Sequence, residues 1–317
     1  MPQPASPLYR DPIFDGAADP VVVWNRAARS WWMFYTQRRA NVDSPGVAYC
    51  HGCTIGVAVS EDNGATWVYQ GGLQLSFREW GESTFWAPDI VFHDGLYHMF
   101  VGYIPGVPNH WRGKARMAHY TSANLWQWTF EGLLKLSSDG VIDATLLQMP
   151  DGQWRMWYKD EARGSVTMVA HSANLRDWEL SLEPAIGGKA HEGAKVFRFG
   201  DWYWMLTDEW GGMRVYRSTD CERWEKQGMI LDGPSHRPED TPNGAHGDVV
   251  VVGNKAYVFY FSHPGRPSHF GETVDADGMV PYSQRRSSIH VAPLQIVDGT
   301  LVCDRDTPFD FDLPDLS

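Results

Sequence analysis

The 317-residue chain has few cysteines and no excess of positive charge, and each scarcity excludes a class of protein. Four cysteines are too few for a disulfide scaffold of this length, and only Cys50 and Cys53 lie close together, as Cys-His-Gly-Cys. A structural zinc site needs about four ligands. No second Cys/His pair stands at a suitable spacing, so we expect ordinary reduced thiols. The formal net charge of −12 argues against nucleic acid or an anionic membrane surface as partner.

Long apolar runs are also missing. No stretch approaches the roughly 18 apolar residues of a transmembrane helix, and residues 1–10 show neither the basic nor the apolar region of a signal peptide. We therefore expect a cytoplasmic protein if the chain is full length, and a secreted or periplasmic one if a leader was removed. Sustained 3.6-residue periodicity is almost absent, so helices should be few and short.

The residues that are abundant indicate an all-β protein. Aromatic residues make up 14% of the chain, with 16 tryptophans, and there are 31 glycines and 20 prolines. Aromatic side chains suit pleated strands, while glycine and proline mark turns. A Ser-to-Trp unit recurs four times, and its tryptophans lie 46 to 61 positions apart, which is typical of propeller blades. The copies are Ser60–Trp67, Ser122–Trp128, Ser172–Trp178 and Ser218–Trp224.

Each unit begins with an apolar run of strand character and continues through short turns. The first contains runs at Asp19–Trp24, Trp31–Thr36 and Thr54–Ser60 before the strand at Trp67, which makes four strands. Equivalent runs begin near residues 89, 143, 192 and 246, and the fifth unit lacks the Ser-to-Trp copy. Because no linker separates the units, we predict a single domain over residues 1–317. Its predicted fold is a five-bladed β-propeller, with four-stranded antiparallel blades around a central channel.

Ionisable residues stand at the start of each predicted innermost strand. They are Asp19, Asp89, Asp143, Glu192 and, in the fifth unit, His246 with Asp248. A propeller brings these positions together at one mouth of the channel, where like charges raise one another's pKa values. Clusters of perturbed acids are candidate functional sites. Paired carboxylates with tryptophan stacking surfaces suit glycoside hydrolysis, in which one carboxylate activates water and one carboxylic acid protonates the leaving oxygen.

The order of these motifs, one in each blade, resembles the five-bladed β-propeller glycosidases of glycoside hydrolase family 43 and their relatives. The motifs are Ala18-Asp19-Pro20, Trp86-Ala87-Pro88-Asp89-Ile90, Ile142-Asp143, Glu192-Gly193 and His246-Gly247. The resemblance implies that Asp19 is the general base, that Asp143 orients and tunes the proton donor, and that Glu192 is the general acid. It also implies that Trp86 shapes the sugar pocket.

Further roles follow from the same resemblance. In many members the fifth-blade histidine helps to hold a calcium ion or water, so we expect calcium near His246, while no organic cofactor is implied. Arg286 resembles a substrate-contacting arginine. Three more residues are candidates for the sugar pocket: Phe85, just before the second-blade motif, Asp89, within that motif, and His51, in a long loop that leads into a strand. Each of these three also has a structural alternative, as core filler, strand cap or loop residue.

Two motifs depart from the family pattern and indicate a distant branch. Ala144 follows Asp143 where proline is usual, and Glu192-Gly193 continues with Ala194-Lys195, with His191 just before. His191 is therefore an alternative proton donor, ranked behind Glu192.

Long insertions at Gln37–Gly52, Pro105–Lys114, Pro234–Ala245 and Pro264–Arg285 favour a walled pocket and short substrates.

We therefore predict an inverting, exo-acting glycoside hydrolase that cleaves pentose-type glycosides, either an α-L-arabinofuranoside or a β-xyloside, from a small oligosaccharide. Three other functions compete with it. Ser60–Trp67 fits the Asp-box turn of sialidases, but the arginine triad of that class is missing. A glycoside phosphorylase on a related propeller would use Lys195, Arg286 and His246 for phosphate. A non-catalytic carbohydrate-binding propeller is also open, and the sequence leaves the oligomeric state undetermined.

Overall fold

The structure is a computed structural model in which residues 3–75, 81–267 and 272–316 are described. Within these ranges the strands form five antiparallel sheets of four strands each. The first sheet contains β1 (Ala17–Asn25), β2 (Ser30–Gln37), β3 (Ile55–Ser60) and β4 (Val68–Gly72). The second contains β5 (Ser83–His93), β6 (Leu96–Pro105), β7 (Arg116–Ser122) and β8 (Thr129–Leu133).

The remaining three sheets repeat this up-and-down order. The third contains β9 (Val141–Gln148), β10 (Trp154–Asp160), β11 (Val166–Ser172) and β12 (Glu179–Leu180). The fourth contains β13 (Glu192–Phe199), β14 (Trp202–Asp208), β15 (Met213–Ser218) and β16 (Glu225–Ile230). The fifth contains β17 (Ala245–Val252), β18 (Lys255–Ser262), β19 (Ser288–Val297) and β20 (Thr300–Val302).

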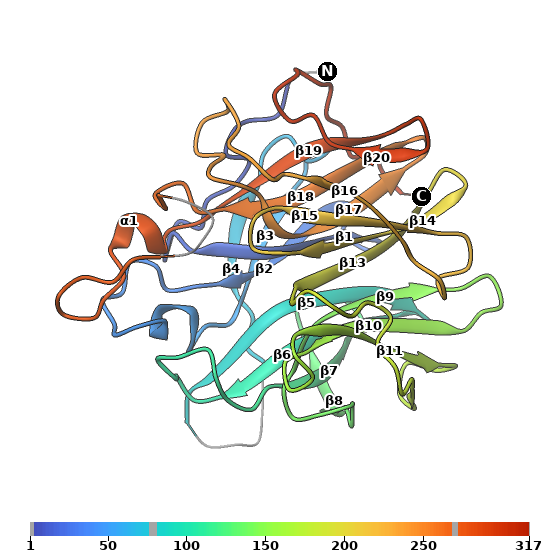
Figure 1. Cartoon of the computed structure of the whole chain (residues 1–317), viewed down its shortest axis with the longest axis horizontal. Helices are drawn as coiled ribbons and strands as arrows, with labels where there is room; N and C mark the ends of the chain where they lie inside the picture. Colours follow the sequence, from blue (N-terminus) through green and yellow to red (C-terminus); the bar gives the residue numbers. More distant parts are fainter. Residues whose placement is uncertain (1–2, 76–80, 268–271, 317) are drawn as a thin grey trace.

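The first strands of the five sheets, β1, β5, β9, β13 and β17, contact one another in a closed ring (Figure 1). The prediction of a five-bladed β-propeller is therefore confirmed. Helices are short, as expected: η1 (Ala48–Cys50) and α1 (Tyr282–Arg285). In the part of the chain that the structure describes, neither helix has the length and apolar character needed to cross a bilayer.

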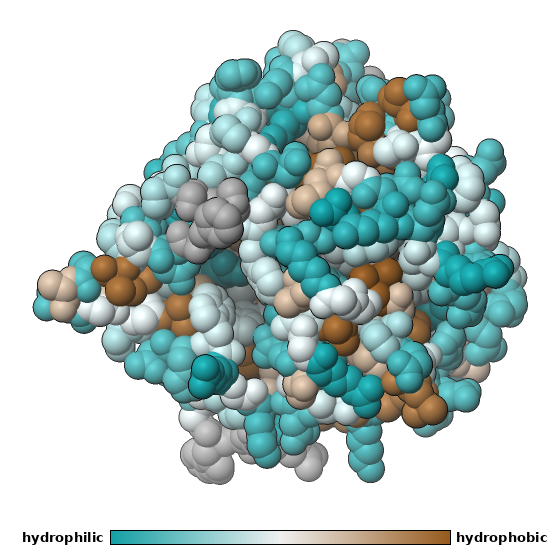
Figure 2. All heavy atoms as spheres, in the orientation of Figure 1, coloured by the Kyte–Doolittle hydropathy of each residue, from teal (hydrophilic) through white to brown (hydrophobic). Residues whose placement is uncertain are grey.

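Apolar side chains fill the spaces between neighbouring blades. Between the first two blades, Phe34, Val57, Met99 and Tyr120 form one buried cluster, and similar clusters occupy the other four junctions. Alternation along each strand places apolar side chains on both faces of a blade, so every sheet is buried on two sides. This explains why the inner strands read as nearly continuous apolar runs, while the outermost strands, such as β4 and β8, are half-buried or exposed. Hydrophilic residues predominate on the outer surface shown in Figure 2, where hydrophobic residues form only small, separate groups.

The Ser-to-Trp repeat forms the turn between the third and fourth strands of blades one to four. The Ser122 hydroxyl accepts the Leu125 N–H at 2.9 Å, and the Trp128 indole N–H donates to the Leu125 carbonyl at 3.0 Å. Leu125 has a left-handed backbone with φ of 66°. The repeat is thus a folding device on the outer part of the blade.

Both ends of the chain fasten the fifth blade to the first. Near the N-terminus, Tyr9 pairs with Ile289 of β19. Near the C-terminus, Leu313 donates its N–H to the Asn63 carbonyl at 2.9 Å and accepts the Trp31 indole N–H at 2.9 Å. These contacts close the ring without exchanging a strand between blades.

A bulge interrupts the inner strand of every blade near its start. The residue at the bulge has a left-handed backbone in four blades, at Asp19, Ala87, Asp143 and Gly193, with φ between 45° and 58°. Such a bulge breaks the alternation of side chains and redirects them. The fifth bulge falls at His246 and Gly247.

The bulges correct the alignment expected from the sequence. Asp19 and Asp143 are equivalent to each other and to Ala87 and Gly193. Glu192 stands one residue before its bulge, and Asp89 stands after its own, opposite Phe100. The acids therefore lie at different depths along the channel, which the apolar runs alone do not reveal.

Candidate active site

Three blades bring Asp19, Asp143 and Glu192 to the bulged ends of their inner strands, around His246 of the fifth blade. The His246 imidazole lies 3.5 Å from an Asp19 oxygen, and its ring packs against Gly193, where a Cβ atom would stand only 2.4 Å away. Asp143 accepts the Gly193 N–H at 3.1 Å. The three sequence-predicted catalytic acids thus share one electrostatic site.

Asp19 is held as a carboxylate. Its side chain is 9% exposed, and the Arg38 guanidinium lies 3.2 Å from one of its oxygens. Burial favours the neutral acid, but Arg38 and His246 outweigh it and lower the pKa of Asp19 to about 2. Asp19 is therefore ionised over the whole neutral range, as a base must be.

Glu192 faces a lysine from the neighbouring blade. Lys159 of β10 donates to Glu192 at 2.9 Å and to Glu161 at 3.1 Å, and its side chain is only 6% exposed. Burial would raise the pKa of Glu192, but Lys159 holds it below its ordinary value. At 28% exposure the Glu192 side chain is also the most accessible of the three acids.

Asp143 and Asp208 are buried carboxylates with the opposite tendency. Burial, with the negative charge of Glu192, raises the pKa of Asp143 to about 6 and that of Asp208 to about 7. Asp208 ends β14 and is paired in register with Glu192. It accepts the main-chain N–H of His246 at 2.8 Å and that of Trp210 at 2.7 Å. These bonds join the fourth blade to the fifth beside the acids.

The site contains four carboxyl groups and three cationic groups. The carboxyl groups belong to Asp19, Asp143, Glu192 and Asp208, and the cationic groups to Arg38, Lys159 and His246. Burial disfavours the charged imidazole, but the hydrogen bond to Asp19 and the surrounding acids raise the pKa of His246 to about 9. Calcium prefers oxygen ligands. Among the described residues, no three His, Cys, Asp or Glu side chains form a metal-binding group. The calcium ion expected near His246 stays a prediction.

An aromatic wall leads away from the acids. Trp86 donates its indole N–H to the Cys50 carbonyl at 2.7 Å, and its ring lies 4.6 Å from His51 and 6.0 Å from Trp111. His51 is 1% exposed, and burial lowers its pKa to about 4. His51 therefore packs against Trp86 as a neutral ring, and the nearby Cys53 is a free, buried thiol.

Phe85 and Asp89 lie away from the mouth that holds Asp19, Asp143 and Glu192. Phe85 packs between blades against Tyr103, at 5.7 Å between ring centroids. Asp89 accepts the Leu146 N–H at 2.7 Å and pairs with Lys195 at 3.1 Å. Lys195 also reaches Asp248 at 2.7 Å. Lys195 thus bridges two buried aspartates inside the channel, and these three residues line a cavity of about 430 Å³.

Arg286 and His191 are occupied by other contacts. Arg286 pairs with Glu239 at 2.6 Å and with Asp15 at 3.3 Å. The His191 ring lies 2.7 Å from the Thr167 hydroxyl and 2.8 Å from the Lys189 carbonyl, so both its nitrogens are engaged. Burial also lowers the pKa of His191, which disfavours it as a proton donor.

Arg38, Lys159 and Asp208 belong to the site but were not identified from the sequence. Each lies at the end of a second strand or just beyond it. The second strand runs back toward the mouth where the first begins, so its last residues face the acids. A search for charged residues ending the second strands would have found them.

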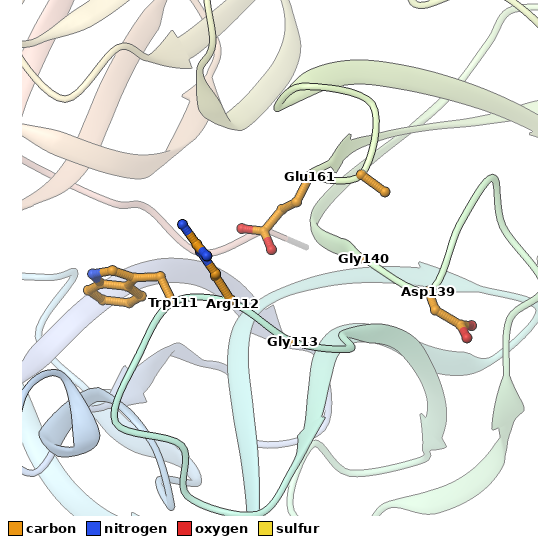
Figure 3. Close-up of a pocket in the computed structure, with 7 residues that line it drawn as sticks. Trp111, Arg112, Gly113, Asp139, Gly140 and Glu161 are labelled. Carbon is orange, nitrogen blue, oxygen red and sulfur yellow. The ribbon is translucent and has the colours of Figure 1, made fainter.

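A hollow of about 440 Å³ opens on the rim between blades two and three. Figure 3 shows Trp111 and Arg112 on one side of it and Glu161 on another. Glu161 links this hollow to the acids through Lys159.

The fold and this site together define a propeller with a carboxylate cluster at one channel mouth, the architecture of a class of carbohydrate-active proteins. The model of glycosyl hydrolases family 43 matches residues 74–278, well over half of the 317 residues. The chain belongs to this family.

Individual relatives are distant. A probable arabinan endo-1,5-alpha-L-arabinosidase A of Emericella nidulans is 27% identical over 142 residues, covering 41% of this chain and 42% of that protein. The chain thus spans less than half the length of this curated relative. A thermostable family-43 glycoside hydrolase has a TM-score of 0.67 at 17% identity, covering 96% of this chain and 99% of the other. The GH43_1 enzyme from Xanthomonas citri complexed with xylose has a TM-score of 0.64 at 15% identity, covering 90% and 89%.

Proposed function

We propose that the protein is an inverting glycoside hydrolase that releases a terminal pentose, an α-L-arabinofuranosyl or β-xylosyl unit, from a short oligosaccharide. The observation that carries the proposal is the convergence of Asp19, Asp143 and Glu192 on one mouth around His246. Inverting hydrolysis needs one carboxylate that activates water and one carboxylic acid that protonates the leaving oxygen, and this mouth supplies both kinds of group.

Asp19 acts as the base. Its low pKa keeps it ionised, and Arg38 and His246 fix its carboxylate in place. It accepts a proton from the water that attacks the anomeric carbon. The C–O bond to the leaving group then breaks, and the leaving oxygen receives its proton from the opposite side of the sugar.

Glu192 supplies that proton. Lys159 lies between Glu192 and Glu161, at 2.9 Å and 3.1 Å. A shift of the ammonium toward Glu161 weakens the interaction that keeps Glu192 ionised. Substrate binding that displaces Lys159 and excludes water then raises the proton affinity of Glu192. Asp143 adds a negative charge nearby and tunes the donor in the same direction.

Hydrolysis fits the charges better than phosphorolysis does. A phosphate site needs cations that are free to bind an anion. Lys195 is buried between two aspartates, Arg286 pairs with Glu239, and His246 pairs with Asp19. The cations that the phosphorylase alternative requires are thus already neutralised within the described residues.

Exo action is supported by loops that meet on the catalytic face. The loop after β2 pairs with the loop before α1 through Gly46 and Met279. The same loop donates its Val47 N–H to the carbonyl of Asn109, in the loop between β6 and β7, at 3.2 Å. Loops of blades five, one and two are therefore joined to one another at the end of the propeller where the inner strands begin, which favours a pocket closed on one side. The pentose assignment draws on the relative described as acting on arabinan and on the structure with xylose.

The test is hydrolysis of chromogenic pentosides, with and without phosphate, followed by NMR of the first anomer released. We expect phosphate-independent turnover with inversion. Asp19→Asn and Glu192→Gln should each reduce kcat by at least about a hundredfold while sugar binding persists. Asp151→Asn, at an exposed turn, is the matched control. Retention of configuration, or loss of binding equal to the loss of turnover, would refute the proposal.

A further inference from the structure

We propose that the 440 Å³ hollow on the rim between blades two and three is a binding site for the leaving-group sugar, recognised by Trp111, Arg112 and Glu161. This inference rests on the hydrolase function proposed above. It makes the preferred substrate an oligosaccharide with at least one sugar on the leaving side of the cleaved bond.

The position of the hollow relative to the acid supports this assignment. The leaving oxygen must lie beside the proton donor, so the leaving group extends from Glu192 away from Asp19. Lys159 contacts Glu192 at 2.9 Å and Glu161 at 3.1 Å. Glu161 lines the hollow. One lysine side chain therefore separates the proton donor from the proposed sugar site.

The side chains around the hollow suit a sugar. Trp111 is 51% exposed, which is unusual for so large an apolar side chain and leaves a ring face available for stacking. Among the described residues no carboxylate pairs with Arg112, whereas the neighbouring Lys114 pairs with Asp139 at 3.6 Å. Arg112 and the 31% exposed Glu161 can thus donate to and accept from sugar hydroxyls. An aromatic platform with a few polar groups is the usual composition of a small-ligand site.

The walls of the hollow are joined to each other. Asp139 accepts the Ala115 N–H at 2.8 Å through its main-chain carbonyl, and the Ala115 carbonyl accepts the Val141 N–H at 2.9 Å. These bonds tie the end of the Trp111 loop to the start of β9 in the third blade. Trp111 also lies 6.0 Å from Trp86, so the aromatic wall continues from the catalytic mouth onto the rim. The site is therefore formed before a ligand arrives.

The experiment compares two substrates that share the same pentose. One is a disaccharide or trisaccharide, and the other is the corresponding glycosyl fluoride, whose leaving group cannot fill a sugar site. Trp111→Ala and Arg112→Ala are measured against Trp126→Ala and Arg223→Ala, which remove an exposed tryptophan and an exposed arginine elsewhere.

We expect Trp111→Ala to reduce kcat/KM for the oligosaccharide by about tenfold and for the fluoride by less than about twofold. Arg112→Ala should show the same selectivity, and both control variants should match wild type on both substrates. Equal losses on the two substrates, or no loss on either, would overturn the site. If wild type hydrolyses neither substrate, the proposed hydrolase function fails first, so the two failures are distinguishable.

Discussion

Replacing Asp208 with asparagine should change how stability depends on pH. Asp208 is 2% exposed, and burial, with the charge of Glu192, raises its pKa to about 7 from the ordinary 3.8. For an acid with a raised folded-state pKa, the folded protein holds an extra proton between these two values. The contribution of Asp208 to the free energy of unfolding of the wild type is therefore fully present below pH 3.8 and is lost as the pH rises through 7.

The expected magnitude follows from the two pKa values. The rise from 3.8 to about 7 corresponds to about 4 kcal/mol, since each unit is worth about 1.4 kcal/mol. The asparagine side chain cannot ionise, so the free energy of unfolding of the Asp208→Asn variant does not fall by this amount as the pH rises. The amide also disturbs the bonds that Asp208 accepts from His246 and Trp210, but that cost does not vary with pH and cancels in the comparison.

Reversible urea unfolding at several pH values between about 4.5 and 8.5 measures the effect. The difference in free energy of unfolding, Asp208→Asn minus wild type, should grow by about 3 kcal/mol from about pH 4.5 to about pH 8.5. This is less than the full change of about 4 kcal/mol because the wild type has already lost the first part below about pH 4.5. Asp151→Asn, in an exposed turn, should run parallel to wild type. If the Asp208→Asn curve also stays parallel, Asp208 does not hold the extra proton and the electrostatic account of the site is wrong.

Three further predictions concern the cations of the site and the channel. His246, whose pKa is raised to about 9 from 6.5, adds stability that is present below pH 6.5 and lost toward pH 9. His246→Gln should abolish that decline in urea unfolding, and an unchanged slope would contradict it. Lys159 lowers the pKa of Glu192, so Lys159→Met should move the basic limb of the kcat/KM profile to higher pH, whereas a shift to lower pH would exclude this coupling. Lys195→Met leaves two buried carboxylates without their cation, and denaturation should show a loss of about 3–5 kcal/mol. A loss below about 1 kcal/mol would show that the channel tolerates these charges.

The fold could be predicted because its signals are local. The Ser-to-Trp turn at Ser122 is built from residues three to six positions apart, so the repeat is visible in the sequence. The apolar runs are also visible in the sequence, because the inner strands of each blade pack on two faces and are largely apolar. The number of repeated units and the number of strands in each unit then predict the propeller.

The site was less accessible to the same reasoning. Asp19, Asp143 and Glu192 carry sequence motifs, and the structure brings them together. Asp89 begins an apolar run just as Asp19 does, yet it lies beyond its bulge and pairs with Lys195. A single inserted residue changes which side chains face the mouth and at what depth, and no local pattern distinguishes the two positions.

The sequence by itself determined the number of blades, their strands and the residues able to do acid–base chemistry, because these depend on short-range turns and apolar spacing. Only the tertiary structure decided the charge state of each acid. Arg38, Lys159 and Asp208 approach Asp19 and Glu192 from second strands, and the separations that set their interactions arise when the ring closes. Electrostatic energy depends on distance and burial, which are properties of the assembled propeller.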